Sequence, residues 1–461
     1  MKPVPHVGTS PALPRGCLRP ICGAALAAGA WTAAMAEDRV IVDPREQAIR
    51  AGSYSRMADF QGELLRLAQR CRGAAAEGLN PDPSGTVGPA TSRVIRSIVG
   101  CPDLANLPGA SPAREGVITN ALWRLVAPGI AEPRLQDRVD ALVLSFEATD
   151  FTDKPEWNFC QDSSIGDRER ARDGHSPIRC FNVSDPCSML TWGPRGATAG
   201  QGREIQWVLW KILKSYPGML ERAFGAEFAN VRRFVRLRGP PLQCAGDSPL
   251  EHFVCAVWRD PARRHAWEEG LVILGQDSFV RHIFQRLYAS EEFDGYKLRA
   301  YYRLWGELGL QPSEIDYAFF YDRATHIGAP PEGLQSRELK MCADAESTAL
   351  TAHAAARRCL SKRHRHPAQS PDREGRDIAF YVDGYAWDAL GDDERKAWTN
   401  HIPLAAGRHF GLSDERLVPI EQVTGGHSEA ADAPPQDSSQ LTQAEKSCPL
   451  EIRAPVRSQP P

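Results

Sequence analysis

The stretch "TWGPRGATAGQGRE", residues 191–204, decides how the middle of the chain is interpreted. Four glycines, at positions 193, 196, 200 and 202, follow Thr191 and precede the helical pattern "IQWVLWKIL". Their spacing matches neither the phosphate loop G-x-x-x-x-G-K-[ST] nor the dinucleotide fingerprint G-x-G-x-x-G. Glycine tolerates positive φ and lets another backbone or a polymeric ligand approach closely. The stretch therefore predicts a strand or hairpin that ends at the start of a helix, and it disfavours nucleotide binding.

The segment before this stretch, "RLQDRVDALVLSFEATD" (134–150), has apolar residues at helical spacing at positions 139, 142, 143 and 146. Pro155 prevents a long continuation, so we expect a helix that ends near Glu147. Glu147 flanks the buried stripe at the C-terminal end, where the helix dipole and desolvation both favour a protonated carboxyl. Glu147 is therefore a candidate general acid. The alternative is an ordinary surface glutamate at a helix end.

Most of the remaining chain also has helical patterns, and the sequence predicts a mainly α (α+β) protein. Further helices are expected over 246–260, 263–290, 294–309 and 313–325, and the last begins with Ser313 and Asp316 in a capping-box arrangement. The basic stretch 361–376 is typical of a solvated loop. We expect an N-terminal helical extension at 37–132, a catalytic domain at 133–425 and, from its Pro, Ser, Gln and Ala content, a disordered tail at 426–461.

Residues 1–36 are typical of a secretory signal peptide. Basic residues precede the apolar run "ICGAALAAGAWTAAMA" (21–36), which ends in the small-x-small pattern Ala34-Met35-Ala36. The alternative is a single membrane anchor, although the run is short for the roughly 20 apolar residues that a span needs. We therefore expect a secreted or periplasmic protein with no membrane association once the leader is removed.

Ten of the twelve cysteines follow the leader, and an even number in an exported chain predicts disulfides. Sequence-local pairs such as Cys71 with Cys101 and Cys342 with Cys359 fit this expectation. The cysteine spacing makes a zinc site a weak alternative. The formal net charge is only −3, which predicts no general attraction to nucleic acid or anionic membranes.

Two motifs together resemble a known family. "ALVLSFEATD" (141–150), followed by T-x-G-x-x-G-x-x-x-G-x-G (191–202), resembles the glycoside hydrolase family 46 chitosanases of the lysozyme-like superfamily. "YDRATHIG" (321–328) resembles a later segment of that family. The resemblance covers roughly residues 136–330. It implies a lysozyme-like fold, helical with a small β-hairpin beside a catalytic cleft.

The resemblance also implies catalytic roles. Glu147 matches the family's general acid, and Thr191 matches the threonine that helps position the hydrolytic water. The family's catalytic aspartate lies a few residues before this threonine, which makes Asp185 the candidate base, with a spacing that departs by one residue. Inverting hydrolysis places such carboxyl groups about 6.5–9.5 Å apart on opposite faces of the sugar. The alternative bases are Asp150, Asp162 and Asp167.

The substrate is expected to be chitosan or peptidoglycan. At the position after Gly202 the family tends to carry a substrate-binding acid, but this chain has Arg203, and Arg195 adds a second positive charge. Arginines suit the carboxylates of peptidoglycan at least as well as chitosan. The candidate substrate-binding residues are Trp192, Gly193, Arg195, Gly196, Arg203, Tyr321, Asp322 and His326. Packing in the core is the alternative role for Trp192, and a structural hydrogen bond is the alternative for His326.

The sequence thus predicts an exported hydrolase that cleaves β-1,4-linked amino-sugar polymers and uses no cofactor or metal. The expected partner is the polysaccharide itself. Two other classes stay open. One is a non-catalytic glycan-binding or cell-envelope structural protein on the same fold. The other is a secreted inhibitor or toxin-like interaction protein that needs no cleft.

Overall fold

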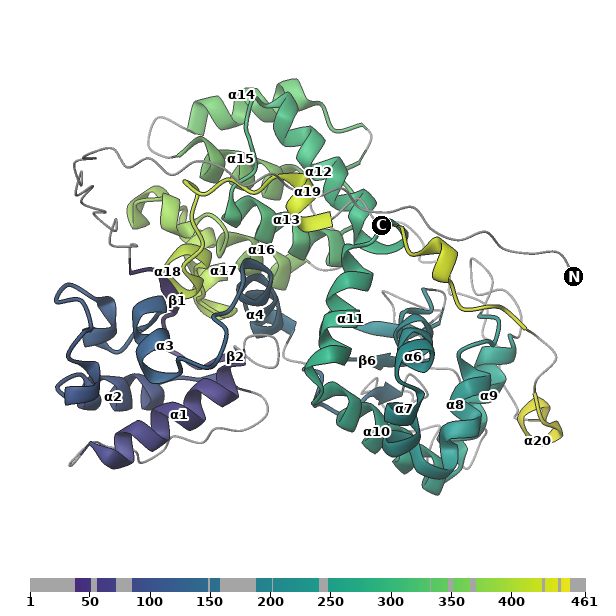
Figure 1. Cartoon of the computed structure of the whole chain (residues 1–461). Coiled ribbons are helices and arrows are strands. Elements are labelled where there is room, and N and C mark those ends of the chain that lie inside the picture. Colours follow the sequence, from purple (N-terminus) through teal and green to yellow (C-terminus); the bar gives the residue numbers. More distant parts are fainter. Residues whose placement is uncertain are drawn as a thin grey trace, which may run out of the picture. The chain divides into compact units, whose positions relative to one another are not determined.

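The computed structural model describes residues 38–50, 56–71, 85–147, 150–157, 188–200, 202–239, 248–331, 333–346, 351–364, 370–424, 428–437 and 441–447 (Figure 1). In these ranges the protein is mainly helical with a few short strands, which confirms the predicted mainly α class. The predicted signal peptide (1–36) and three of the candidate bases, Asp162, Asp167 and Asp185, lie outside them. In the described part, every helix is too short or too polar to cross a bilayer.

The N-terminal segment combines two small antiparallel sheets with three helices. Strand β1 (Val40–Val42) pairs with β4 (Ile118–Thr119), and β2 (Ile49–Arg50) pairs with β3 (Thr86–Val87). The helices are α1 (Met57–Arg70), α2 (Pro89–Ile98) and α3 (Asn120–Val126). The sequence predicted the helices but not the strands.

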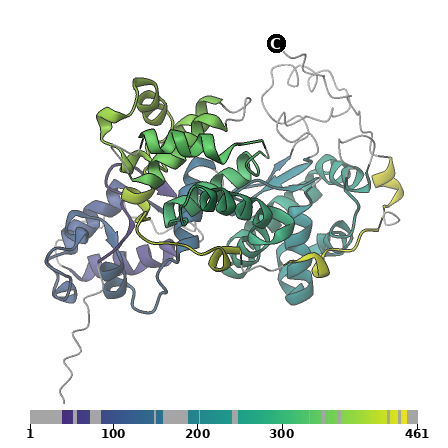
Figure 2. The same cartoon turned by 90° about the horizontal axis from the view of Figure 1, so that it is seen from above.

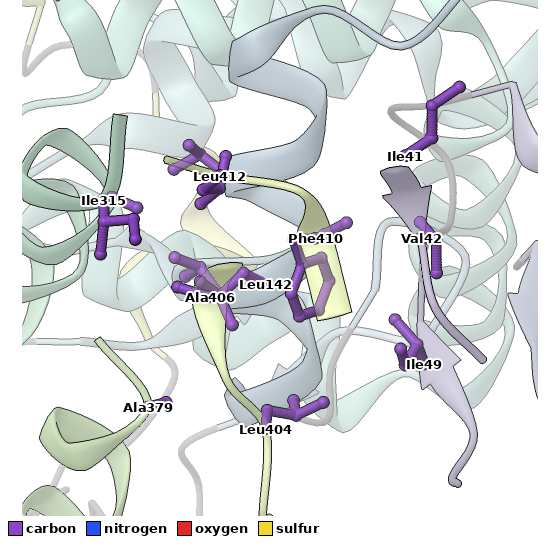
Figure 3. Close-up of a cluster of buried hydrophobic side chains, with 14 of the residues drawn as sticks. Ile41, Val42, Ile49, Leu142, Ile315, Ala379, Leu404, Ala406, Phe410 and Leu412 are labelled. Carbon is purple, nitrogen blue, oxygen red and sulfur yellow. The ribbon is translucent and has the colours of Figure 1, made fainter. Parts of the chain in front are cut away.

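The apolar side chains of this segment share a core with distant parts of the chain. Ile41 and Ile49 pack in one cluster with Leu142 of α4 (Leu135–Glu147) and Phe410 of α18 (Ala406–Phe410) (Figure 3). Helix α18 and strand β1 are in contact. The N-terminal extension and the segment around residue 410 therefore stabilise the same helix, α4, that carries Glu147.

Helix α4 is buried on nearly all sides. Residues 137–146 are all buried, and two hydrophobic clusters meet at this helix: Leu142 and Val143 belong to one, and Leu144 to the other. A helix packed all round holds its last residue in a fixed position, because it cannot rotate or tilt without disturbing close-packed neighbours. The helix ends at Glu147, as the sequence predicts.

A three-stranded antiparallel sheet follows α4 along the chain. Its order is β5 (Glu156–Trp157), β6 (Leu190–Trp192) and β7 (Ala197–Ala199). Strands β6 and β7 form a hairpin whose turn spans residues 193–196. Helix α6 (Glu204–Ser215) begins soon after β7. The predicted hairpin leading into a helix is confirmed.

The second hydrophobic cluster is built by the helices after the sheet. They are α6, α7 (Pro217–Phe224), α8 (Phe228–Phe234), α9 (Pro249–Arg259), α10 (Pro261–Gly275) and α11 (Ser278–Ala289). The prediction of one continuous helix over 263–290 is wrong, because helix α10 ends at Gly275 and a separate helix, α11, begins at Ser278. Asp277 caps α11 by accepting a hydrogen bond from the backbone N–H of Phe279 at 2.8 Å. Gly275 is required there, since a Cβ would lie 2.0 Å from the backbone oxygen of Phe151.

The following helices are α12 (Tyr296–Glu307), α13 (Glu314–His326), α14 (Ser336–Glu346), α15 (Ala352–Arg363), α16 (Ser370–Ile378) and α17 (Asp392–Asn400). The capping box at the start of α13 is confirmed: the Ser313 hydroxyl accepts from the Asp316 N–H, and the Asp316 carboxylate accepts from the Ser313 N–H. The interpretation of 361–376 as a solvated basic loop is wrong. Parts of α15 and α16 occupy this stretch, and Arg373 and Arg376 are buried.

Two stretches of the tail that the sequence predicts to be disordered are held against the helices. The carbonyl of Asp432 accepts a hydrogen bond from the Trp210 indole at 2.9 Å, and Glu445 of α20 (Gln443–Lys446) pairs with Arg233. Helix α20 is in contact with α9, and Figure 1 labels both helices. Figure 2 shows the same chain from above. A short helix, α19 (Ile420–Thr424), precedes these stretches.

Two cysteine pairs predicted from the sequence lie at disulfide distance. Cys71 and Cys101 have their Cα atoms 6.0 Å apart, and so do Cys342 and Cys359. The first pair links the end of α1 to the segment after α2. The second links α14 to α15.

Candidate active site

Glu147 is the last residue of α4, and two basic side chains contact its carboxyl group. Its Oε1 lies 2.5 Å from Nε2 of His326 and 2.5 Å from the guanidinium of Arg376. Neither contact has hydrogen-bond angles at Oε1, which is itself buried. The side chain as a whole is 19% exposed, so its solvent contact comes from atoms other than Oε1. Glu147 is thus fixed on its inner side and accessible on its outer side.

His326 and Asp322 bring a second set of charges to this point from α13. Asp322 lies one helical turn before His326, and its carboxylate accepts hydrogen bonds from Arg376 at 2.7 Å and from Arg373 at 2.5 Å. A nitrogen of the Arg376 guanidinium also lies 2.9 Å from Nε2 of His326. Arg376 therefore touches Glu147, Asp322 and His326 at once. The resemblance implied substrate binding by Asp322, but this side chain is fully buried and supports the site from beneath.

A deeper layer of ion pairs holds α16 against α13 and α15. Asp377 accepts from Arg323 at 2.6 Å, from Ser361 at 2.7 Å and from Arg373 at 2.9 Å. Desolvating so many charges is costly, and apolar residues of the same volume commonly stabilise a core equally well. A buried ion-pair network beneath two partly exposed titratable groups makes this region a candidate functional site. His326, with a side chain 20% exposed, and Glu147 are those two groups.

The charges around Glu147 decide its protonation state. Burial by itself would raise the pKa of this carboxyl, but the attraction of Arg376 and the contact with His326 outweigh burial and lower the pKa to about 2. This lowered pKa favours the ionised form of Glu147 at neutral pH, whereas the sequence predicts a protonated carboxyl. The helix dipole and desolvation favour the acid form, as the sequence suggested, but the Arg376 guanidinium and the contact with His326 oppose them more strongly.

The pKa of His326 is lowered as well, which for an imidazole favours the neutral form. Burial and the positive charge of Arg376 lower the pKa of the imidazole, while Glu147 acts against them. His326 is consequently neutral at neutral pH and carries one ring N–H. A neutral imidazole beside an ionised carboxylate can exchange a proton with a bound molecule.

Thr191 lies on the polar face of the three-stranded sheet. The register places Glu156 of β5, Thr191 of β6 and Thr198 of β7 directly opposite one another, so their side chains share one face. The other face carries buried side chains, among them those of Trp157 and Leu190. The Thr191 hydroxyl lies 3.2 Å from that of Ser188. The sequence missed Glu156, because a two-residue strand gives no period-two pattern to recognise.

Glu204 fixes the outer strand of this sheet. Its carboxylate accepts from the Thr198 N–H at 3.0 Å and from the Thr198 hydroxyl at 2.7 Å. It therefore joins the start of α6 to β7. Glu204 directly follows Arg203. Arg203 stands at the position where the chitosanases tend to carry a substrate-binding acid.

Trp192 packs in the core, which replaces its predicted role in stacking on a sugar. Its side chain is 1% exposed, and its ring meets those of Phe151 and Phe284 edge to face. The turn after it contains Gly193 at φ 72° and Gly196 at φ 61°. These glycines permit the turn, and a Cβ on Gly193 would lie 3.2 Å from the Phe151 ring. Clearing a cleft wall is not needed to explain them.

Arg195 and Tyr321 also lie in the interior and not on a binding surface. The Arg195 guanidinium pairs with Asp294, donates to the Thr325 hydroxyl at 3.0 Å, and lies over the Tyr321 ring at 3.8 Å from its centroid. It pins the hairpin turn to α13, and both side chains are buried. The prediction that they bind substrate is corrected accordingly.

Arg203 has a structural role as well. It precedes α6, its Nε donates to Gln206 at 3.1 Å, and burial lowers the pKa of its guanidinium to about 10. Asp150 is 2% exposed, and its Oδ1 accepts from the Phe151 N–H at 2.6 Å. Asp150 is therefore buried away from solvent, and the remaining candidate bases lie outside the described residues.

Glu147, Asp322 and His326 each offer one atom that could ligate a metal, and these atoms lie within 4.8 Å of one another. Arg376 already bridges the two carboxylates and supplies the positive charge that a cation would bring. Asp316, His353 and Asp414 form a similar group, and there Arg357 bridges the carboxylates. Both groups are explained as arginine-centred ion pairs.

Comparison of this chain with models of protein families, with curated proteins and with solved structures gives no match.

Proposed function

We propose that this protein is an exported glycoside hydrolase that cleaves β-1,4-linked amino-sugar polymers on a lysozyme-like arrangement of helices and hairpin. The carrying observation is Glu147: a partly exposed carboxylate at the end of a buried helix, held by His326 and Arg376. The chain then passes into a sheet whose polar face carries Thr191. A rigid carboxylate close in sequence to a glycine-turned hairpin is what the resemblance to the chitosanases implies.

The charge state of Glu147 defines how it takes part. With a pKa of about 2, Glu147 is ionised at neutral pH in the ligand-free protein, so it can accept hydrogen bonds from a bound molecule but holds no proton to donate. The resemblance assigns the donor role to Glu147. In that role Glu147 must take up a proton before each turnover, so the proposed acid mechanism requires that substrate binding weakens its attraction to Arg376 and raises its pKa.

The second carboxyl group has two candidates. Asp185 is the one that the resemblance implies. Glu156 is the other, because it lies directly opposite Thr191 on the polar face of the sheet. Substitution of each by its amide separates them, because only the catalytic one should reduce turnover as strongly as Glu147→Gln does.

A second function is favoured by one specific observation, the pairing of Glu147 with Arg376. A protein that binds glycans without cleaving them needs no protonated acid, and this ion pair keeps Glu147 ionised. In that case the network beneath Glu147 would serve to shape a binding surface.

The test is hydrolysis of chitosan and of peptidoglycan by the purified full-length protein, measured as release of reducing ends. We expect activity on one polymer and a loss of about a hundredfold or more in Glu147→Gln, the usual effect of removing a catalytic acid or base. Glu338→Gln is the matched control, because Glu338 is an exposed carboxylate that pairs with Arg363 at 2.8 Å on the surface.

Activity that survives Glu147→Gln would remove Glu147 from the mechanism. Cosedimentation with a polymer that is not cleaved would establish the non-catalytic alternative. Near-identical circular dichroism spectra of the variants are needed to attribute a loss to chemistry and not to unfolding.

A further inference from the structure

A cavity lies outside the region around Glu147 and is lined mainly by aromatic and charged side chains. It has a volume of about 510 Å³, within the range of small-molecule sites. Its lining residues come from β1's following loop, from the segment after α16, from α17 and from α18. They include Glu46, Asp383, Trp387, Trp398 and Arg408.

The aromatic part of this cavity includes an indole that reaches solvent. Trp387 is 46% exposed, which is unusual for so large an apolar side chain, and its ring meets that of Trp398 at 5.5 Å in an edge-to-face arrangement. Trp398 is fixed, because its indole N–H donates to the carbonyl of Leu404 at 2.7 Å and only 9% of it is exposed. An anchored tryptophan thus supports an exposed one, and the exposed indole offers a flat apolar surface.

The polar part of the cavity is fixed by backbone contacts. The Asp383 carboxylate accepts hydrogen bonds from the N–H groups of Gly407 and Arg408 at 2.8 and 3.0 Å. The Arg408 guanidinium lies 3.9 Å from the Glu46 carboxylate, at the limit of an ion pair, and both side chains are exposed. Donors and acceptors of hydrogen bonds therefore stand beside the aromatic surface.

Charge and shape limit the class of ligand. A quaternary ammonium would meet a positive charge in this cavity, because the Arg408 guanidinium lies 6.0 Å from the centroid of the Trp398 ring and repels a second cation. A wholly apolar ligand is disfavoured too, since it would desolvate the three charged side chains without compensation. The remaining fit is a molecule with an apolar C–H face and a rim of hydroxyl groups, which is the shape of a pyranose sugar.

We propose that this cavity binds pyranose units of a glycan, with Trp387 stacked on the sugar face and with Glu46 and Arg408 bonded to hydroxyl groups. The site differs from the one at Glu147, and it does not depend on Glu147 being catalytic. Phe146, next to Glu147, packs against Phe380 and stacks on His401 at 5.9 Å, so elements that flank the cavity also support the end of α4.

The test is isothermal titration calorimetry of the full chain carrying Glu147→Gln, which prevents turnover during the measurement. The ligands are oligomers of glucosamine, oligomers of N-acetylglucosamine and soluble peptidoglycan fragments. We expect one class to bind, Trp387→Ala to weaken that binding about tenfold or more, and Trp387→Phe to restore part of it. Tyr216→Ala is the matched control, because Tyr216 is an equally exposed aromatic residue, 55% exposed, with an edge-to-face partner in Phe279.

The proposal is overturned if Trp387→Ala and Tyr216→Ala bind the oligosaccharides equally well, or if none of the three classes binds at millimolar concentration. Binding of tetramethylammonium in place of the sugars would overturn it as well. Hydrolysis assays separate this proposal from the function proposed above. Binding that depends on Trp387 without any turnover refutes only the hydrolase, and turnover with normal binding by Trp387→Ala refutes only the second site.

Discussion

Replacing Glu147 by glutamine should lower the free energy of unfolding relative to the wild type. This loss should be larger at neutral pH than at acid pH. The pKa of Glu147 is lowered from 4.5 to about 2 by Arg376 and His326, against the effect of burial. A carboxyl whose pKa falls on folding stabilises the folded state above its unfolded value and loses that contribution as the pH falls towards the folded value. The difference between the two pKa values corresponds to about 3 kcal/mol of folding free energy at neutral pH.

The amide cannot gain this stabilisation, while Arg376 keeps its pairing with Asp322 in the variant. Urea denaturation of both proteins, followed by circular dichroism, gives the free energy of unfolding at several pH values. The free energy of unfolding of the variant should be lower than that of the wild type by about 3 kcal/mol at roughly pH 7. This difference should shrink by about 1 kcal/mol by roughly pH 3.5. The surface control Glu338→Gln should stay within about 1 kcal/mol of the wild type throughout. A difference that does not change with pH, or no difference at neutral pH, would refute the ion-pair argument for Glu147.

Three further predictions concern stability. Arg376→Met should destabilise the protein by about 3–5 kcal/mol, because it leaves two carboxylates without their shared cation, and denaturant titration measures this. Replacing both Cys342 and Cys359 by serine should lower the free energy of unfolding by about 3 kcal/mol, because the bond closes a loop of 17 residues. Denaturant titration without a reductant measures this loss. Gly193→Ala should lower the free energy of unfolding by about 1 kcal/mol or more, because the φ of Gly193 is 72°. The control Gly306→Ala, in open space on α12, should raise the free energy of unfolding by up to about 1 kcal/mol. Equal effects of the two substitutions would contradict the role of positive φ.

Local signals predicted those parts of the fold that depend on neighbours in sequence. Ser313 and Asp316 marked the start of α13, and apolar spacing marked the end of α4 at Glu147. The glycines at 193 and 196 marked the hairpin turn, although their reason is positive φ and not access for a ligand. The break before α11 also had a local signal, since Asp277 is a good N-cap, but the apolar pattern on both sides obscured it.

The candidate site depended on contacts that no local pattern records. Arg373 and Arg376 stand in a basic, proline-containing stretch, and such a stretch is typical of a surface loop until its partners are known. Those partners, Asp322 and Glu147, lie 51 or more residues away in sequence. The burial of Trp192 and Arg195 likewise follows from packing against other helices. No local pattern records that packing, so the sequence predicts a binding role for both.

The dependence of Glu147 on Arg376 has a consequence for the order in which the protein matures. A chain synthesised from its N-terminus exposes Glu147 long before it exposes α16, and domains fold as their residues leave the ribosome. Until residue 376 has emerged, Glu147 has neither its arginine nor the ion-pair layer beneath it. A nascent chain that stops near residue 330, where the resemblance to the chitosanases ends, should therefore hold Glu147 without these contacts. The contacts of Glu147 should be complete only after roughly the last hundred residues have been synthesised.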